Sequence, residues 1–233
     1  MTIYERTSFT QLFDRDSANL FEDHLFKECV FNNCALSLTK SPQLRSTVRN
    51  VRILDCTSLS CDIGPAVFDN VIVAGLRTND LLIVWGALFK HVTLSGNCGK
   101  LKINKAAHFV DRTAEIQEPF ATARDSFYRN VDWALDISEA RFQEFDMHGV
   151  PARLVRRDAT SQAVVTREKA IQQDWRSRIS RFNTYWPYVI DMFLESGDSD
   201  IVLVAPKAKP KQEVMQLVDG LEDLRQAGVA EPN

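Results

Sequence analysis

Four of the five cysteines stand in two C-x4-C pairs, Cys29 with Cys34 and Cys56 with Cys61. Thiolates held close together are ligands for tetrahedral zinc. The spacing of these four, however, follows a five-residue pattern that runs through much of the chain, and each cysteine occupies the small inward position of that pattern. Because cysteine is a favoured small buried residue, the pattern predicts interior packing and no metal site.

Acid and base chemistry has few candidates among the histidines, His24, His91, His108 and His148, which are scattered along the chain. The sequence contains neither an H-E-x-x-H zinc motif nor a G-x-S-x-G nucleophile elbow. A catalytic base needs a positioned partner, and the sequence places none beside these imidazoles. We therefore expect structural or solvated histidines.

Three isolated carboxylates, Asp62, Asp69 and Asp111, suggest an alternative chemistry. Some β-helical enzymes cut polysaccharides with carboxylates displayed on an outer face, where a pair of them performs acid and base catalysis. A carbohydrate-active enzyme is therefore one alternative function. Isolated surface charges at ordinary frequency would give the same pattern.

Positive charge is the most suggestive functional signal. Residues 151–181 contain eight lysines and arginines against three acids, and three further lysines follow between 207 and 211. Aromatic residues are interleaved with these charges, which is typical of surfaces that bind phosphate or nucleic acid, although Trp175 and Phe182 lie on an apolar stripe and are expected in a core. A solvated basic face is the competing interpretation. The predicted binding residues are Arg153, Arg156, Arg157, Arg176, Arg178 and Arg181.

An internal repeat indicates the elements that position these residues. Residues 63–75, IGPAVFDNVIVAG, align without a gap with residues 84–96, VWGALFKHVTLSG, at an offset of 21. His91 aligns with Asn70, which predicts a solvent-facing corner that accepts any polar residue. Self-similarity at such a period is the signature of a solenoid.

Within each copy a large apolar residue recurs every five positions, with a small or apolar residue two places before it, as in Ala66 with Phe68. This period fits neither an amphipathic helix nor a long strand, but it fits a short extended segment followed by a bend. Four such steps bring the chain back above its start. We therefore predict a right-handed parallel β-helix with coils of about 20 residues, about six of them between Phe31 and Met147.

Residues 29–38, CVFNNCALSL, resemble the pentapeptide-repeat family, whose pattern is a small residue, a polar residue, Leu or Phe, and two variable positions. The resemblance covers residues 24–152, with slips near 76–81, 97–130 and 133–135. It is degenerate, because the residue between the paired positions is mostly apolar or basic. The resemblance implies a right-handed quadrilateral β-helix, and it adds the idea of a DNA-shaped surface that acts on topoisomerases.

After Pro151 the five-residue pattern stops, which divides the chain into residues 1–152, a β-helix with an N-terminal lead-in, and residues 153–233, an α/β segment. The pattern of residues 154–167 predicts two short strands that form a hairpin around residues 158–161. Because the open end of a β-helix exposes unpaired backbone and apolar core, the simplest role for the α/β segment is to cap it. A dimer interface is the competing use.

Helical spacing predicts three helices in the α/β segment. Residues 167–183 carry an apolar stripe that we expect to be buried, and Pro187 opens a second helix that ends at Gly197. A buried strand, residues 201–205, precedes a last helix that ends near Gly228. The stripe of the first helix is Ile171, Trp175, Ile179 and Phe182.

Composition excludes several classes of protein. Of the 233 residues, 45% are hydrophobic and 25% are charged, and the net charge is −3, so the chain is neither disordered nor collagen-like. No apolar stretch approaches the length of a membrane helix, and an odd number of cysteines favours reduced thiols, so we expect a cytoplasmic protein. Residues 1–152 hold only about three net negative charges, whereas DNA mimicry needs a dense negative face.

Together these features predict a mainly β protein, a right-handed parallel β-helix with a C-terminal α/β appendage or cap. The expected function is non-enzymatic: a macromolecular-interaction scaffold of the bacterial regulatory, inhibitor or immunity type, without cofactor or metal, whose partner is a protein. A carbohydrate-active enzyme is the alternative. Binding of nucleic acid or another anionic partner through residues 153–181 is a second alternative, and a homodimer stays open.

Overall fold

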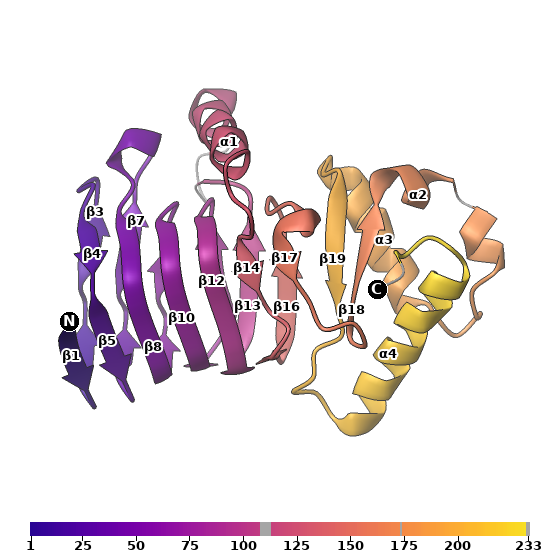
Figure 1. Cartoon of the computed structure of the whole chain (residues 1–233), viewed down its shortest axis with the longest axis horizontal. Coiled ribbons are helices and arrows are strands. Elements are labelled where there is room, and N and C mark those ends of the chain that lie inside the picture. The colour runs from indigo at the N-terminus through magenta and orange to yellow at the C-terminus, as the bar shows by residue number, and fades with distance from the viewer. Residues whose placement is uncertain (108–112, 173, 232–233) are drawn as a thin grey trace.

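The computed structural model describes residues 1–107, 113–172 and 174–231. Its N-terminal part consists of two all-parallel sheets in which consecutive strands stack side by side, and an α/β segment follows (Figure 1). This architecture is of the β-helix type, as the sequence predicts. Two residues singled out in the sequence, His108 and Asp111, lie outside the described residues.

Each coil contributes strands to both sheets, and the described strands form six coils, after which β17 begins another. The larger sheet contains β1 (Thr2–Glu5), β2 (Ser8–Thr10), β4 (Leu20–Glu22), β5 (His24–Lys27), β6 (Val30–Asn32), β8 (Thr47–Leu59), β10 (Val67–Thr78), β12 (Leu88–Asn97), β14 (Leu135–Asp136), β15 (Ala140–Arg141) and β17 (Val155–Arg156). The smaller sheet contains β3 (Phe13–Arg15), β7 (Ala35–Leu38), β9 (Asp62–Ile63), β11 (Leu82–Trp85), β13 (Lys100–Asn104) and β16 (Glu144–Met147).

The repeat seen in the sequence is the register between two coils. Phe68 of β10 pairs with Phe89 of β12, and Val71 pairs with Val92, at the predicted offset of 21. The two phenylalanine rings are stacked, with their centroids 5.6 Å apart. The inward positions predicted for Phe31, Ile53, Ile63, Phe68, Val84 and Phe89 are all buried or partly buried.

The five-residue period has its origin in the corners of the coil. One residue in five adopts a left-handed backbone with positive φ, as at Asn50, Asp55 and Ser60. Between corners the backbone is extended, so the period is four extended residues and one bend. Left-handed φ is most accessible to Gly, Asn and Asp, which explains the polar residues and glycines at these places.

Corners of successive coils also stack on one another. His91 and Asn70 both have positive φ, 55° and 56°, and lie at equivalent corners, so the predicted polar corner is confirmed. Asn70 Nδ2 donates a hydrogen bond of 2.9 Å to Oδ1 of Asn50 in the coil before it. Polar side chains at this corner therefore link coil to coil on the outside, while apolar side chains do so inside.

The cysteines pack in the interior, as predicted. Cys29 and Cys56 are buried, and Cys34 and Cys61 are half-buried. Their thiols donate to backbone carbonyls, as in the 3.4 Å contact from Cys56 Sγ to the carbonyl oxygen of Leu54. Burial raises the pKa of Cys56, so this thiol stays protonated. Among the described residues no group of three or more His, Cys, Asp and Glu side chains could hold a metal ion.

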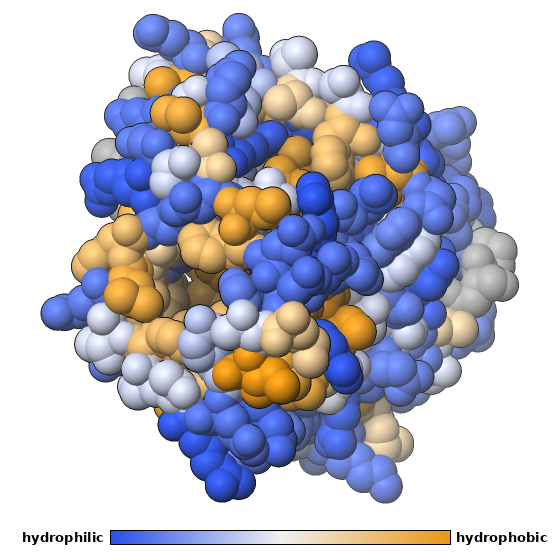
Figure 2. Space-filling model, turned by 60° about the vertical axis from the view of Figure 1, so that its left-hand side comes forward, coloured by the Kyte–Doolittle hydropathy of each residue, from blue (hydrophilic) through white to orange (hydrophobic). Residues whose placement is uncertain are grey.

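The coils begin earlier and vary more in length than the sequence predicts. The N-terminal stretch, predicted as a lead-in, already forms the first coil, because β1 pairs with β5 and β2 with β6 (Figure 2 turns this end towards the viewer). Two coils are longer than the rest. One carries a loop with a short helix, η1 (Pro42–Leu44), and another carries α1 (Ala114–Tyr128), which lies outside the coils above β12 and β14 (Figure 1). Neither insertion follows the five-residue pattern, so neither was predicted.

A two-stranded antiparallel sheet closes the C-terminal end of the coils. It consists of β18 (Gln162–Thr166) and β19 (Asp200–Val204). Val164, Val202 and Val204 pack into the core of the coils, whereas Ala163, Val165, Ile201 and Leu203, on the other face, pack into a second core with the helices. The α/β segment is therefore a cap, which we call the cap from here on.

Two predictions about the cap are wrong. Residues 154–167 do not form a hairpin, because β17 joins the coil strand β14 and β18 pairs with β19 instead. Residues 167–183 are not one helix but α2 (Arg167–Ile171) and η3 (Asp174–Ser177). Of the predicted stripe only Trp175 is fully buried, where Nε1 donates to the carbonyl oxygen of Ala170 at 3.0 Å.

The rest of the cap agrees with the sequence. Helix α3 (Tyr185–Ser196) ends at Gly197, whose φ of 77° is left-handed, and α4 (Lys211–Gln226) follows the buried strand. Another short helix, η2 (Ala152–Leu154), lies between β16 and β17, within the coils. No helix among the described residues is long and apolar enough to cross a membrane.

We expect Phe89→Ala to lower the free energy of unfolding by about 3–5 kcal/mol, because it leaves a cavity in the stacked interior. Phe182→Ala is the control, since that ring is 79% exposed and its loss should change stability by less than about 0.5 kcal/mol. Urea unfolding followed by circular dichroism measures both. Equal effects of the two substitutions would contradict the stacked interior.

Candidate functional site

The six predicted arginines come from the last coil and from the cap, and several of them contact groups of the protein itself. Arg176 and Arg178 of the cap are paired, with Asp191 at 2.5 Å and with Asp174 respectively. Arg156, at the last coil, lies over the ring of Trp133, 4.0 Å from its centroid. Asp191, which lies outside the segment 151–181, thus offsets part of the positive excess counted there.

The remaining three arginines each have a different environment. Arg153 donates at 3.3 Å to the carbonyl oxygen of Tyr128 at the end of α1. Burial lowers the pKa of Arg157, which lies nearest to Glu231 and Arg225 among charged groups. Arg181 is exposed and lies over the ring of Phe182, at 4.8 Å.

An exposed aromatic surface was not foreseen. Helix α3 buries Trp186, Ile190 and Phe193 on one side. Its opposite side presents Tyr185 and Tyr188, which are 51% and 62% exposed. Two further exposed side chains, one on the same helix and one three residues before its start, complete what we call the aromatic surface. It consists of Phe182, Tyr185, Tyr188 and Met192.

One histidine has the positioned partners that the sequence did not reveal. His148 follows β16, and its Nδ1 lies 2.9 Å from Oδ2 of Asp198, while its Nε2 lies 3.3 Å from Oδ1 of Asp146. Lys102 and Lys105 pair with the two carboxylates at 2.6 and 2.9 Å. Because Asp198 belongs to the cap and the other four to the coils, this cluster ties the cap to the coils.

These contacts shift the pKa values of all three acid–base groups. Hydrogen bonds from His148 to Asp146 and Asp198 raise the pKa of the imidazole to about 9. Burial opposes ionisation of each carboxyl, but hydrogen bonds from His148 and the lysines outweigh it and hold the pKa of each at about 2. The cluster is thus a charged clamp at neutral pH.

The other described histidines are structural. His91 Nε2 lies 2.6 Å from Asp132 Oδ1, and its ring stacks at 4.8 Å on Trp133. His24 contacts the edges of Tyr4 and Phe26. Both agree with the expectation from the sequence.

Of the carboxylates proposed for carbohydrate chemistry, the two in the described part of the chain lie in different sheets. Asp69 lies on β10 between two cations, 3.7 Å from Arg49 and 3.8 Å from Lys90. Asp62 lies on β9, in the other sheet. The pair of carboxylates that the fold does bring close, Asp146 and Asp198, is occupied by His148.

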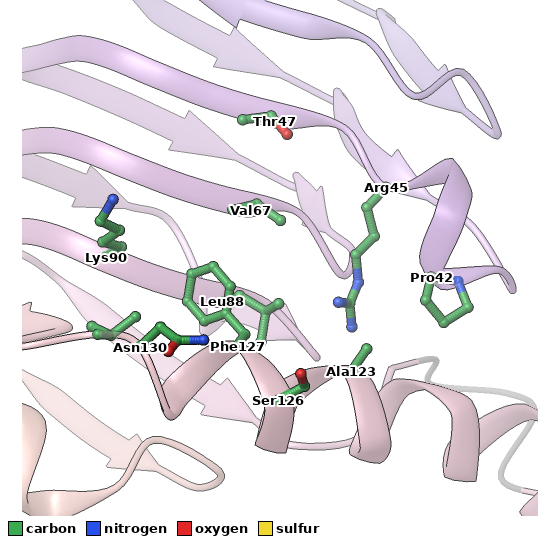
Figure 3. A pocket seen from close by; sticks show the side chains of 11 residues that line it. Pro42, Arg45, Thr47, Val67, Leu88, Lys90, Ala123, Ser126, Phe127 and Asn130 are labelled. Atoms are coloured by element: carbon green, nitrogen blue, oxygen red, sulfur yellow. The ribbon is translucent and has the colours of Figure 1, made fainter.

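A groove lies beside α1, on the outside of the coils (Figure 3). Its floor is formed by Thr47, Val67 and Leu88, which occupy equivalent positions at the start of three neighbouring strands. Helix α1 forms one wall, and the loop that carries η1 forms the other. The cavity measures about 670 Å³, which is the size of an ordinary small-molecule site.

The groove exists because both insertions leave the coil at the same corner, between the smaller sheet and the larger one. The two coils between them turn this corner tightly. At Gly64 a Cβ would lie 2.2 Å from the carbonyl oxygen of Ser37, so no side chain fits there. The short corners form the bottom of the groove and the long ones form its walls.

Arg45 is the residue of this groove that sequence reasoning missed. It is only 9% exposed, and its guanidinium lies over the ring of Phe120 on α1, 4.7 Å from the centroid. Burial lowers its pKa to about 10, so it stays charged at neutral pH. No signal in the sequence marks it, because its burial depends on α1, more than 70 residues further along the chain.

Comparisons with protein-family models, with curated proteins and with solved structures found no match. The resemblance to pentapeptide repeats therefore rests on the residues and on the coil geometry alone.

We expect stability to depend on pH through His148. Its pKa is about 9 in the folded protein against an ordinary 6.5, so its contribution is complete below pH 6.5 and is lost as pH rises through 9. The loss should be roughly 1–2 kcal/mol, because part of the interaction is screened by solvent. Urea unfolding at pH 6 and pH 9.5 measures it.

His148→Gln keeps hydrogen bonding without the charge, and it should remove this pH dependence. Asp146 and Asp198 act in the opposite sense, since their contribution is present above the ordinary pKa of 3.8 and is lost as pH falls towards 2. If the variant lost as much stability as the wild type between pH 6 and pH 9.5, the clamp would be refuted.

Proposed function

We propose that this chain is a non-enzymatic scaffold that binds another protein through the aromatic surface of its cap. The observation that carries the proposal is the solvent exposure of Phe182, Tyr185, Tyr188 and Met192. Large apolar side chains gathered on one face commonly mark an interaction site. None of the four is needed for the core of the cap, which α3 completes from its other side.

The chemistry of this surface favours a protein partner that has an apolar pocket rimmed by carboxylates. Tyrosine, phenylalanine, methionine and arginine are enriched at the centres of protein interfaces. Tyr185 and Tyr188 lie three residues apart and Met192 four further on, so all three project from one side of α3. Arg181, which forms no ion pair with a described carboxylate, supplies the positive charge beside Phe182.

The outer surface of the coils supports a protein partner better than a nucleic acid. Glu22, Arg49, Asp69 and Lys90 occupy equivalent positions on four successive coils, so positive and negative charges alternate along the coil axis. Neither a nucleic-acid-binding surface nor a DNA mimic is built this way, because each needs charge of one sign. For the scaffold itself we propose a right-handed coil of the pentapeptide-repeat type. We do not extend this likeness to a DNA-shaped surface.

Two further observations bear on the proposal. All five cysteines are free thiols, which supports the expected reducing, cytoplasmic compartment. Two of the six arginines of the alternative nucleic-acid surface, Arg176 and Arg178, are paired with Asp191 and Asp174. That pairing would have to be broken before those arginines could bind phosphate.

Photo-crosslinking in cells tests the proposal. A benzoylphenylalanine placed at Tyr188 should give a discrete protein adduct, and the same group placed at Ile72, which is exposed on the outer face of β10, should not. The captured partner should bind Tyr185→Ser/Tyr188→Ser at least about tenfold more weakly than wild type, because aromatic residues dominate interface energies.

Two outcomes would count against this function. One is a partner whose affinity is the same for the tyrosine variant and for wild type. The other is retention of the purified chain on DNA or heparin that falls steeply with salt and is lost in Arg181→Ala, which would favour the nucleic-acid alternative.

A further inference from the structure

The groove between α1 and the η1 loop lies away from the aromatic surface and has a different chemistry. Figure 3 shows Arg45 reaching from one side of the groove towards Ala123 and Ser126 of α1, with Phe127 and Leu88 beside it. An apolar floor with a few converging polar groups is the usual composition of a small-molecule site.

Arg45 is a buried cation with no carboxylate partner among the described residues. Among the described residues, its Nε and Nη2 atoms have no hydrogen-bond partner. Buried charges in proteins are normally paired or neutralised, so an unpaired one requires an explanation. Arg124 on α1, which is itself paired with Asp125 at 3.2 Å, lowers the pKa of Arg45 further, and Tyr128, whose own pKa burial raises, stays neutral.

The unpartnered atoms are the two that make a bidentate contact. Nε and Nη2 lie on the same edge of the guanidinium, and this edge matches the two oxygens of a carboxylate. Neither atom is exposed to solvent. A ligand in the groove can therefore reach this edge only if the side chain of Arg45 turns it towards the groove, and the flexible arginine side chain permits this. The aromatic ring of Phe120 under the guanidinium keeps its plane defined.

The remainder of the groove fits an apolar body attached to that carboxylate. Val67, Leu88 and Phe127 supply apolar contacts, and Ser126 and Asn130 offer hydrogen bonds from α1. Lys90, at the far end, is bound only loosely, 3.8 Å from Asp69. No carboxylate is among the described residues that line the cavity.

We propose that this groove is a binding site for a small organic carboxylate, whose anionic group pairs with Arg45 and whose apolar part lies on the floor formed by Val67 and Leu88. The ligand neutralises the buried cation. It also bridges the coils to α1, because Arg45 comes from the η1 loop and the opposite wall comes from the helix.

The test uses the full chain and three matched probes. Phenylacetate carries the carboxylate, phenylacetamide is its neutral isostere, and phenyl phosphate carries a tetrahedral oxyanion. Isothermal titration and thermal shift at constant ionic strength should show saturable binding of phenylacetate. Binding of phenylacetamide should be at least roughly tenfold weaker, because a hydrogen bond to a charged group is worth that factor or more.

Substitutions distinguish binding through Arg45 from nonspecific binding of the probes. Arg45→Met keeps the length of the side chain and should weaken phenylacetate binding by roughly tenfold or more. Arg45→Lys keeps the charge without the fork and should also bind more weakly than wild type. Arg181→Met, a surface arginine in the cap, is the control and should bind like wild type.

Several results would overturn the site. They are no saturable binding of phenylacetate, equal binding of the amide, equal binding by Arg45→Met, and tighter binding of phenyl phosphate, which would exclude a carboxylate as the preferred ligand. Should Arg45→Met not fold, the comparison of phenylacetate with phenylacetamide on the wild-type chain decides the matter.

Discussion

The backbone hydrogen bonds between neighbouring coils govern the rest of this structure. In a parallel stack every strand must lie in register with the strand of the coil before it, so each coil must turn its corners at the same places. Side chains in one position then meet the same position of the next coil. This register places Phe68 against Phe89 inside the coils and Asn70 beside His91 at the outer corner. The left-handed corners make this register compatible with a tight turn every five residues.

The apolar core of the coils has to be covered where the stack ends, and the cap covers it. The antiparallel pair β18 and β19 faces two cores at once, since alternate residues of a strand point to opposite sides. Val164 therefore completes the coils while Val165 completes the cap. His148 adds an electrostatic link at the edge of the same junction, with Asp146 on the coil side and Asp198 on the cap side. Cap and coils are thus joined by apolar packing in the middle and by charge at the rim.

The sequence predicts the features that repeat and misses those that do not. The offset of 21 is visible because no insertion lies between the two matched segments, and the inward cysteines follow from the same pattern. Helix α1 breaks the pattern, so nothing in the five-residue spacing announces it. The run 162–166 is buried on both faces, and such a strand does not reveal its partner. The sequence therefore predicts the buried strand that becomes β19 but not its pairing with β18, more than 30 residues earlier. Phe182 shares helical spacing with Trp175, yet the helix stops between them and leaves the ring in solvent. The candidate sites depend on such long-range contacts, and Arg45 is recognisable only once α1 covers it.

Because of where the two insertions lie, the width of the groove depends on the number of coils between them. Its walls belong to the second and fifth coils, and its floor to the plain coils between them, which rise by about 4.8 Å each. The distance between the walls is therefore a whole number of coil heights. Duplicating or deleting one plain coil would widen or narrow the groove by one fixed step while every wall residue kept its local surroundings. A repeat architecture of this kind could change the size of the molecule it accommodates in increments, by recombination rather than by point substitution.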